Sequence, residues 1–511
     1  MTGKVFIVGA GPGDPELISV KGKRILEECG AVVYDRLIPM ELVVALPKRV
    51  RRIYVGKSAG KHSKSQDEIN IMLAELAEEG LNVVRLKGGD PFIFGRGGEE
   101  ALYLRNKGIP FEVIPGITAG AAAPAYAGIP VTHRNKAVFT IFLTAHEADE
   151  KEEAQIPWQW LSQVRNGTIA GYMGVKRLSA VTGNLIEGGM PVNTPAAVIE
   201  KGTTGLQKSV IGTVSDIAEK AEKAQILPPA LFVIGEVVEL SKEIAWRIPG
   251  VLAGKRVMVT RPASQAALMY ASLRQLGAEV LPLPAIEIEE YNNEDNWKEV
   301  YQQIRISHKS YQDWIIFTSE NGVRYFLSQL GQHAMDSRDL CDFMIAVVGT
   351  GTEAALNDIG LSADFVPTKA TVAALAEELI EEMGEFPGRV IRVKGNLGEP
   401  IIEDTLKSQG YNVIPLQVYS AITAEWDEGM FTLLEDNPPD LITFTSGSTV
   451  KGFFEILGEE RAKDTARRAV IASIGPMTSQ TLREYNIDVE IKAEVHSVPG
   501  LIDAVKRYFH K

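Results

Sequence analysis

The 511-residue chain has few of the residues that build disulfide frameworks or metal centres. It contains two cysteines, Cys29 and Cys341, and seven scattered histidines without ligand spacing. A disulfide-stapled module needs an even set of closely spaced cysteines, and a structural zinc site needs clustered Cys and His ligands. The sequence therefore predicts neither a disulfide framework nor a metal site.

Long apolar runs are also missing. The apolar segment of residues 116–131 is rich in Ala and Gly and contains Pro124 and Pro130. It is shorter than the roughly 18 apolar residues that a membrane-spanning helix needs. The apolar run in MTGKVFIVGAGPGDP is interrupted by Gly and Pro, unlike the hydrophobic region of a secretory signal. We expect a cytoplasmic protein without a membrane partner.

Lys and Arg are fewer than Asp and Glu, which gives a formal net charge of −13. An acidic chain argues against nucleic acid as a partner. The first 64 residues are an exception, with twelve Lys or Arg against six Asp or Glu, concentrated in residues 48–64. This segment is either a solvated basic face or a surface suited to a small polyanionic ligand.

Apolar β-branched runs alternate with helical patterns along the whole chain, as in VFIVGAG, AVVYD, NVVRLKGGD and VFTIFLTA. The alternation predicts an α/β architecture with largely buried parallel strands. The pattern pauses at residues 241–253, and a new strand begins near residue 256. We therefore place a linker there, between two halves of similar length.

The second half, residues 254–511, contains an internal quasi-repeat. DWIIFTSENGVRYFL resembles DLITFTSGSTVKGFF, AVVGTGTEAAL resembles ASIGPMTSQTL, and GAEVLP from Gly277 resembles GYNVIP from Gly410, at offsets of 126 to 133 residues. Two copies predict a bilobed domain with a ligand between the lobes. The hydroxyl-rich ends of its strands suit either carboxylate binding or helix capping. This half shows no nucleophile elbow and no P-loop.

The first half begins with a strand that runs into Gly9, Gly11 and Gly13, followed by a helical stretch and a strand that ends at Asp35. A dinucleotide-binding loop needs the spacing G-x-G-x-x-G, which is not present, and the prolines of this loop remove amide donors. An NAD-dependent oxidoreductase is therefore the alternative and not the main hypothesis.

Two further segments are unusually rich in small residues. KGGDPFIFGRGGEE, residues 87–100, allows close approach of a ligand to the backbone, with Asp90 as an acceptor for an ammonium or hydroxyl group. A tight turn explains GGDP alone, but not all fourteen residues. PGITAGAAAPAYAGIPVTHR, residues 115–134, suits either ligand contact or close helix packing.

These segments, with VVYDRLI, YVGKSAGKHS, GYMGVKRL and PAAVIEKGTT, resemble the uroporphyrinogen-III C-methyltransferases of the tetrapyrrole methylase family. The resemblance implies two α/β lobes, residues 1–115 and 116–240, with S-adenosyl-L-methionine between them and S-adenosyl-L-homocysteine as its product. It also implies a homodimer formed through this half. The implied cofactor contacts are Pro12, Gly88, Gly89, Asp90, Ile93, Thr118, Ala119, Met173 and Gly202.

The same resemblance assigns Asp35 as a general base and Lys57 as an acid in methylation of uroporphyrinogen III at C2 and C7. The product, precorrin-2, feeds sirohaem and cobalamin. Methyl transfer to a pyrrole carbon depends on alignment of the two reactants, and the later proton loss needs a base. Two alternatives stay open: Asp35 caps a turn, and Lys57 binds a substrate carboxylate.

The second half resembles uroporphyrinogen-III synthase, through GKRVMVTRP, LGAEVLPLPAIEI, FTSENGV, GNLGEPIIEDTLKSQGYNVIPLQVYSA and IGPMTSQTL. The resemblance implies interleaved lobes, residues 254–286 with 421–511 and residues 287–420, that cyclise hydroxymethylbilane with inversion of ring D. It assigns Tyr419 to assisting the departure of hydroxide. Substrate contacts are implied for Ser319, Thr352, Ser446 and Thr478. A non-catalytic tetrapyrrole-binding module is the alternative for this half.

Overall fold

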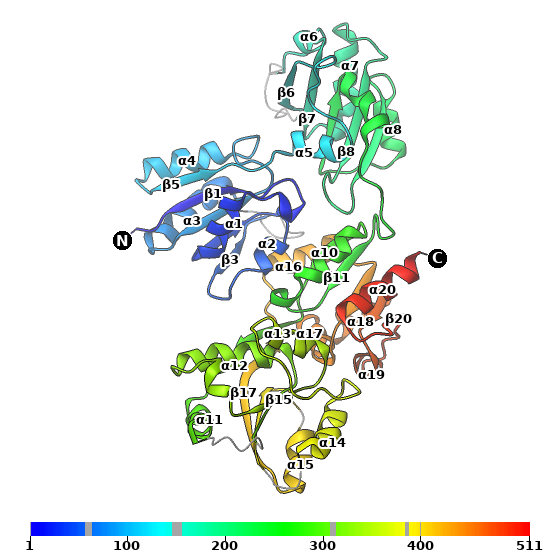
Figure 1. The fold of residues 1–511 in the computed structure, drawn as a ribbon. Coiled ribbons are helices and arrows are strands. Elements are labelled where there is room, and N and C mark those ends of the chain that lie inside the picture. Colours follow the sequence, from blue (N-terminus) through cyan, green and yellow to red (C-terminus); the bar gives the residue numbers. More distant parts are fainter. Residues whose placement is uncertain are drawn as a thin grey trace. The chain divides into compact units, whose positions relative to one another are not determined.

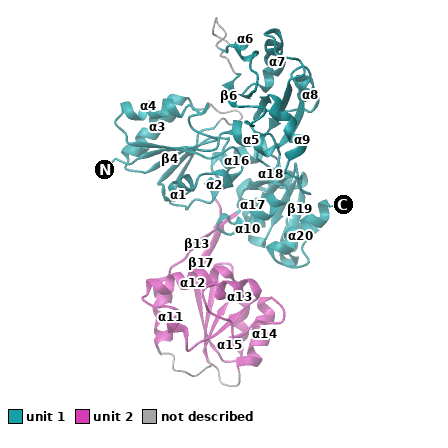
Figure 2. Ribbon diagram, turned by 45° about the horizontal axis from the view of Figure 1, so that its top comes forward, with its two compact units in different colours: residues 1–285, 425–511 teal, residues 286–424 magenta. Residues whose placement is uncertain are grey.

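The computed structural model describes residues 2–56, 64–145, 156–306, 313–383, 388–398 and 400–510. The chain forms two compact units, residues 1–285 with 425–511 and residues 286–424 (Figures 1 and 2). The described residues build four five-stranded sheets, three in the first unit and one in the second. Within these ranges no helix is long and apolar enough to cross a membrane. The same ranges contain no group of three or more His, Cys, Asp or Glu side chains that could hold a metal ion.

The first sheet has the strand order β3-β2-β4-β1-β5, and all of its pairs are parallel. Helices α1 and α2 pack on one face, and α3 and α4 on the other. Strands covered on both faces are mostly apolar, as the fully buried AVVY of β2 shows, although the equally buried β4 also carries Arg85 and Lys87. The elements are β1 (Val5–Gly9), α1 (Val20–Glu28), β2 (Ala31–Tyr34), α2 (Glu41–Val44), β3 (Arg51–Tyr54), α3 (Gln66–Glu78), β4 (Val83–Lys87), α4 (Gly97–Asn106) and β5 (Phe111–Ile114).

The second sheet, β6-β7-β10-β8-β9, is mixed. Strands β6 and β7 are parallel, whereas the other three pairs are antiparallel, so the expectation of parallel strands is wrong here. The connection between β8 and β9, residues 201–207, is too short for a parallel crossover. The elements are α5 (Ala119–Tyr126), β6 (Phe139–Thr144), α6 (Trp158–Leu161), β7 (Gly167–Tyr172), α7 (Leu178–Glu187), β8 (Pro195–Glu200), β9 (Lys208–Thr213), α8 (Ile217–Lys223), β10 (Ala230–Ile234) and α9 (Ser241–Ile244).

The third sheet, β12-β11-β18-β19-β20, is parallel throughout and belongs to the same unit as the first two. It shares packing with the first sheet: Val44 of α2 belongs to the buried cluster under α16, α17, α18 and α19. The Tyr34 hydroxyl also donates to Asp427 Oδ2 at 2.6 Å. The elements are β11 (Arg256–Val259), α10 (Ala267–Gln275), β12 (Glu279–Pro282), α16 (Glu428–Asp436), β18 (Leu441–Phe444), α17 (Gly447–Leu457), α18 (Glu459–Arg467), β19 (Val470–Ser473), α19 (Pro476–Glu484), β20 (Ile491–Lys492) and α20 (Val498–Phe509).

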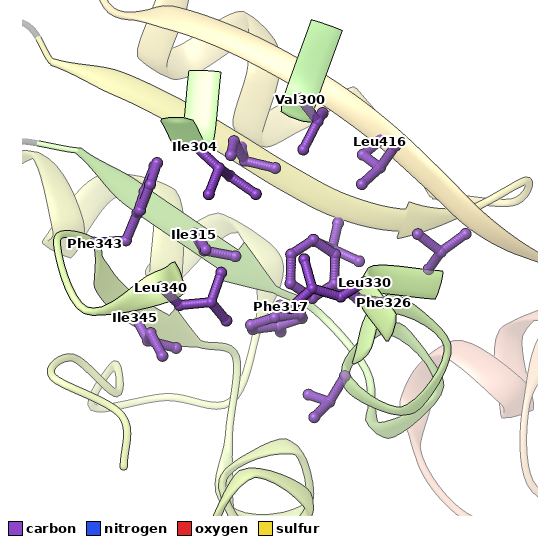
Figure 3. Close-up of a cluster of buried hydrophobic side chains, with 14 of the residues drawn as sticks. Val300, Ile304, Ile315, Phe317, Phe326, Leu330, Leu340, Phe343, Ile345 and Leu416 are labelled. Carbon is purple, nitrogen blue, oxygen red and sulfur yellow. The ribbon is translucent and has the colours of Figure 1, made fainter. Parts of the chain in front are cut away.

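The fourth sheet, β13-β17-β16-β14-β15, makes up the second unit. Strand β13 is antiparallel to β17, and the other pairs are parallel. On one face Phe317, Phe326 and Leu330 lie together in a buried cluster (Figure 3). The elements are β13 (Ile286–Glu290), α11 (Glu294–Ile306), β14 (Trp314–Phe317), α12 (Glu320–Gln332), β15 (Met344–Val347), α13 (Thr350–Asn357), α14 (Val372–Met383), β16 (Arg389–Gly395), α15 (Ile401–Ser408) and β17 (Asn412–Thr423).

The structure confirms the quasi-repeat as a repeat of secondary structure. In one copy β14 leads into α12, and in the other β18 leads into α17. Ser319 and Ser446 are the corresponding N-caps, and the side chain of each accepts a hydrogen bond from a backbone amide of its helix. Gly277 and Gly410 also correspond, because each follows a helix with a positive φ, +89° and +88°. Left-handed backbone of this kind favours glycine.

Candidate active sites

Three glycine loops meet at the carboxyl ends of β1, β4 and β5. The Gly89 amide donates to the Gly11 carbonyl at 2.7 Å, and the Gly11 amide donates to the Gly89 carbonyl at 3.3 Å. Gly89 has a φ of +68°. A Cβ atom on Gly116 would lie 2.3 Å from the Gly89 carbonyl oxygen, which excludes any larger residue at position 116. The loops therefore lie backbone against backbone, and their polar backbone groups line the ends of the strands.

The predicted cofactor contacts lie in segments that follow strands, and Ala119 among them is the first residue of α5. Contacts also connect these loops: Gly202 packs on Ala123 of α5, and a Cβ on Gly13 would lie 3.3 Å from the Gly202 carbonyl oxygen. The structure thus brings the predicted set into one continuous region. Its members are Pro12 after β1, Gly88, Gly89, Asp90 and Ile93 after β4, Thr118 and Ala119 after β5, Met173 after β7 and Gly202 after β8.

Asp90 holds two of these loops together. Its Oδ1 accepts a hydrogen bond from the Phe92 amide at 2.8 Å, and its Oδ2 accepts one from the Gly116 amide at 3.0 Å. The first bond belongs to a local turn, as expected if GGDP is only a tight turn. The second bond crosses to the loop after β5, so Asp90 does more than close its own turn.

Tyr172, the last residue of β7, joins the second sheet to these loops. Its hydroxyl lies 2.5 Å from Thr118 Oγ1 and accepts a hydrogen bond from the Gly120 amide at 2.6 Å. Its ring centroid lies 5.0 Å from that of Phe94. Burial raises the pKa of Tyr172, so its phenol stays protonated at neutral pH. The next residue, Met173, has a φ of +55° and a largely exposed side chain.

A surface hollow of about 540 Å³ lies beside Met173. The hollow is open to solvent, and Met173 is the predicted cofactor contact among its lining residues. The fit to the cofactor that the sequence implies therefore rests on the glycine loops, whose backbones approach so closely that no side chain fits between them. The lining residues are Pro91, Phe92, Phe94, Arg96, Gly97, Gly98, Glu99 and Met173.

Asp35 directly follows β2 and makes two kinds of contact. Its Oδ1 accepts a hydrogen bond from the Leu37 amide at 3.1 Å, so it does cap a turn. Its Oδ2 lies 3.2 Å from Nη2 of Arg85, a buried residue of the neighbouring strand β4. The other predicted acid–base residue, Lys57, lies outside the described residues.

The sequence analysis missed a buried charge network next to Asp35. Arg85 Nε donates to Glu100 Oε1 at 3.1 Å, and Lys87 Nζ donates to the same oxygen at 2.9 Å. Glu100 is fully buried, and the side chains of Arg85 and Lys87 are 4% and 6% exposed. Burial lowers the pKa of Lys87. The sequence did contain a signal for this network, namely two cations within the otherwise apolar strand VVRLK. Buried charges need partners, so these cations indicate a buried carboxylate nearby.

In the second unit, two predicted residues of the synthase half come together. The hydroxyl groups of Tyr419 on β17 and Ser319 on the N-cap of α12 lie 3.0 Å apart. The Tyr419 ring stacks on Tyr325 at a centroid distance of 6.1 Å. A Cβ on Gly395 would lie 2.5 Å from this ring, so β16 needs glycine where the tyrosine crosses it. The phenol of Tyr419 is therefore held at a defined place beside Ser319.

Cations lie on the strand that carries Gly395. Arg392 is buried and paired with Glu403 of α15, and Lys394 Nζ lies 3.2 Å from the same carboxylate. Burial lowers the pKa of Arg392 to about 10. Thr352, also predicted to bind substrate, is buried near the start of α13.

The two remaining predicted substrate contacts lie in the first unit, at the ends of β18 and β19. Ser446 caps α17 by accepting from the Thr449 amide at 3.2 Å, and its hydroxyl lies 2.8 Å from that of Ser448. Thr478 is buried in the first turn of α19. Helix capping, the ordinary explanation for hydroxyl residues at strand ends, is thus present at Ser446.

Both halves of the chain match known proteins. The family model described as tetrapyrrole (corrin/porphyrin) methylases matches residues 4–218, and the model described as uroporphyrinogen-III synthase HemD matches residues 268–503. A porphyrin biosynthesis protein HemD from Ruminiclostridium josui is 36% identical over 504 residues, which cover 98% of this chain and 97% of that protein. A uroporphyrinogen-III C-methyltransferase from Methanocaldococcus jannaschii is 51% identical over 241 residues, 47% of this chain and 98% of that protein.

Solved structures also match the first half. The native uroporphyrin III C-methyl transferase of Thermus thermophilus is 36% identical and is matched over its whole length by 47% of this chain, with a TM-score of 0.40. The sheets define an α/β protein. Its first half has two lobes, with a candidate site formed by glycine loops at the ends of strands. Its second half contains a duplicated α/β pattern. The chain belongs to the tetrapyrrole methylases through its first half and to the uroporphyrinogen-III synthases through its second.

Proposed function

We propose that this chain is a bifunctional enzyme of tetrapyrrole biosynthesis. The second half cyclises hydroxymethylbilane to uroporphyrinogen III, and the first half methylates that product at C2 and C7 to give precorrin-2, which leads to sirohaem and cobalamin. The methylase proposal rests on the convergence of Gly11, Gly89 and Gly116 at the carboxyl ends of the strands of a parallel sheet, the same end at which Asp35 follows β2. Ligands of such sheets bind where the strands end.

S-adenosyl-L-methionine, when bound, supplies an electrophilic methyl group. The residues that hold it in this proposal are the nine predicted contacts, from Pro12 to Gly202. Backbone groups of the glycine loops bind its polar ends, and the apolar side chains near Met173 exclude water. Alignment of the two reactants contributes most to a transfer of this kind. Asp35 accepts the proton that the methylated pyrrole loses, and Lys57 acts as an acid or binds a substrate carboxylate.

In the synthase half, Tyr419 assists departure of hydroxide from hydroxymethylbilane, and its contact with Ser319 orients the phenol for that step. Thr352, Ser446 and Thr478 bind the substrate. Because cyclisation depends mainly on holding a linear tetrapyrrole in a folded shape, few catalytic groups are needed. Lys394, close to Gly395 and Tyr419, is suited to a substrate that carries eight carboxylates.

The proposal also covers assembly and organisation. The methylase lobes are residues 1–115 and 116–240, and the synthase lobes are residues 254–286 with 421–511 and residues 287–420. The enzyme is a homodimer through its methylase half, which light scattering of the purified chain tests. Both substrates are water-soluble polyanions, and we place the reactions in the cytoplasm.

A coupled assay tests both activities. The full chain receives hydroxymethylbilane with and without S-adenosyl-L-methionine, and the tetrapyrroles are identified by mass and isomer analysis. Type III uroporphyrinogen without the cofactor, and a dimethylated product with it, are the expected results. If the isomer formed is only the spontaneous type I, the second half is a binding module. If the chain binds NAD and transfers no methyl group, the first half is an oxidoreductase.

A further inference from the structure

The linker between the two halves makes hydrogen bonds and ring contacts with the methylase half. In residues 241–253, the Trp246 indole Nε1 donates to the Ala125 carbonyl at 3.0 Å. The indole also meets the ring of Tyr126 edge-on, at a centroid distance of 5.2 Å. Trp246 is 60% exposed, yet its indole Nε1 and its ring both make contacts at the end of α5. A simple tether would need none of these contacts.

The next residue, Arg247, is half-buried and contacts two methylase segments. Its Nη2 donates to the Thr204 carbonyl at 2.7 Å, and its Nη1 donates to Gln207 Oε1 at 3.4 Å. Its guanidinium carbon lies 5.6 Å from the centroid of the Tyr126 ring. Arg247 therefore joins the loop between β8 and β9 to the end of α5.

These contacts continue to the first glycine loop. The Tyr126 hydroxyl donates to Asp14 Oδ2 at 3.0 Å, and the Asp14 amide donates to Thr203 Oγ1 at 3.1 Å. Gln207 closes the network, because its Oε1 accepts from the Thr203 amide at 2.8 Å and its Nε2 donates to the Tyr126 carbonyl at 3.2 Å. Burial and the Asp14 carboxylate raise the pKa of Tyr126 to about 12, so the phenol is a donor at neutral pH.

The network joins three of the segments that carry predicted cofactor contacts. Asp14 lies two residues after Pro12, Thr203 directly follows Gly202, and Tyr126 ends the helix that begins at Ala119. The matched methylase segment ends at residue 218 and the matched synthase segment begins at residue 268, so Trp246 and Arg247 lie outside both.

We propose that Trp246 and Arg247 are positioning residues for the cofactor site of the methylase half. They hold the end of α5, the loop that carries Gly202 and the loop that carries Pro12 in one arrangement before the cofactor binds. Preorganisation of this kind improves affinity by lowering the cost of ordering on binding. The inference rests on the proposed function, because it takes the methylase site as the place where S-adenosyl-L-methionine binds.

The test uses the full chain and two independent readouts. S-adenosyl-L-homocysteine is titrated calorimetrically into the wild type, Arg247→Ala, Tyr126→Phe and the control Lys242→Ala, which removes an exposed cation of the same linker. Steady-state methylation gives KM for S-adenosyl-L-methionine and kcat separately. The synthase rate of each sample reports whether the rest of the chain is folded.

We expect Arg247→Ala to bind S-adenosyl-L-homocysteine about tenfold more weakly, the net contribution of one or two hydrogen bonds. KM should rise by a similar factor while kcat changes less than about twofold, which is the signature of lost ground-state binding. Tyr126→Phe, which keeps the ring and removes the link to Asp14, should show a smaller loss of the same kind. Lys242→Ala should match the wild type.

Two results separate the inference from the function on which it rests. If the wild type binds S-adenosyl-L-homocysteine and both Arg247→Ala and Tyr126→Phe bind it equally well, the positioning role is overturned and the proposed function stands. If the wild type does not bind it, the proposed methylase function fails. If Arg247→Ala also loses synthase activity, its weaker binding reflects a general folding defect. The affinity of Tyr126→Phe for S-adenosyl-L-homocysteine then decides whether the positioning role holds, because this variant keeps the linker contacts of Trp246.

Discussion

Asp35 and Arg85 form an ion pair, with Oδ2 and Nη2 3.2 Å apart. Arg85 belongs to the central strand β4, is almost completely buried and also binds Glu100. One guanidinium therefore connects a buried carboxylate to one that is partly open to solvent. Because Arg85 is buried and paired with Glu100, it offers the Asp35 carboxylate a partner at a fixed place on the sheet.

The first prediction separates the two contacts of Asp35. Asp35→Asn keeps an oxygen that accepts from the Leu37 amide and removes the base. We expect methylation to fall by about 10²- to 10⁴-fold, the usual contribution of a general base, with an unchanged synthase rate. The measurement is transfer of labelled methyl groups to uroporphyrinogen III. Methylation at the wild-type rate would leave Asp35 with its turn-capping role alone.

The second prediction concerns Tyr419. Tyr419→Phe removes the hydroxyl that contacts Ser319 and keeps the ring that stacks on Tyr325. We expect slower formation of uroporphyrinogen III and unchanged methylation when that product is supplied directly. Tyr325→Phe is the matched control, because the hydroxyl of Tyr325 contacts the Ile288 carbonyl. Equal synthase rates for the two variants would make Tyr419 a structural residue.

The third prediction tests the core shown in Figure 3. Phe326 is fully buried, and its ring lies 5.4 Å from Phe317 and 5.5 Å from Trp297. Phe326→Ala should lower the free energy of unfolding of the second unit by about 3–5 kcal/mol, the cost of lost burial plus a cavity. Ile359→Ala, at an exposed position of the same unit, should change it by less than about 0.5 kcal/mol. Denaturant titration followed by tryptophan fluorescence measures both values.

The fourth prediction is a dependence on pH. Burial raises the pKa of Glu279, although its carboxylate accepts a hydrogen bond from the Gly205 amide at 2.9 Å. As pH rises through the unfolded pKa of a glutamate, the unfolded chain loses this proton first, so the contribution of Glu279 to stability falls. Glu279→Gln keeps an acceptor and does not ionise. It should be more stable than the wild type at pH 7, and the difference should shrink toward pH 4.

A carboxylate with the opposite shift provides the control. Hydrogen bonds from Lys21 and Lys4 lower the pKa of Glu112 to about 2. Its contribution is therefore present above the unfolded pKa and is lost as pH falls toward 2. Thermal unfolding midpoints of Glu279→Gln and Glu112→Gln, measured from pH 3 to 7, should move in opposite directions relative to the wild type. Parallel curves would contradict both assignments.

The sequence predicted the elements of this protein better than it predicted their pairing. The strands around AVVYD and the glycine loops are present because apolar runs and Gly-rich turns act locally. The duplication was evident from the similarity of the two repeated segments, and the helix N-caps at Ser319 and Ser446 occupy equivalent positions in them. The direction of β8, β9 and β10 was predicted wrongly, because an apolar run carries no sign of the direction of its neighbour.

Part of the candidate site was also hidden in the sequence. Asp35 and the glycines stand at recognisable positions, at the ends of strands. Glu100 is the last residue of the glycine-rich segment 87–100, and its burial under Arg85 depends on how α4 packs on the sheet. The contacts of Trp246 and Arg247 join residues that are 40 to 121 positions apart in the sequence. Such contacts arise from tertiary structure, which local patterns do not encode.

The packing that Val44 shares with the third sheet, and the bond between Tyr34 and Asp427, have a genetic consequence. Tyr34 immediately precedes Asp35, whereas Asp427 begins a helix of the synthase half. An allele that changes either side of this junction alters a contact that both halves share. Because one chain encodes the two sides of this contact, they are always inherited together.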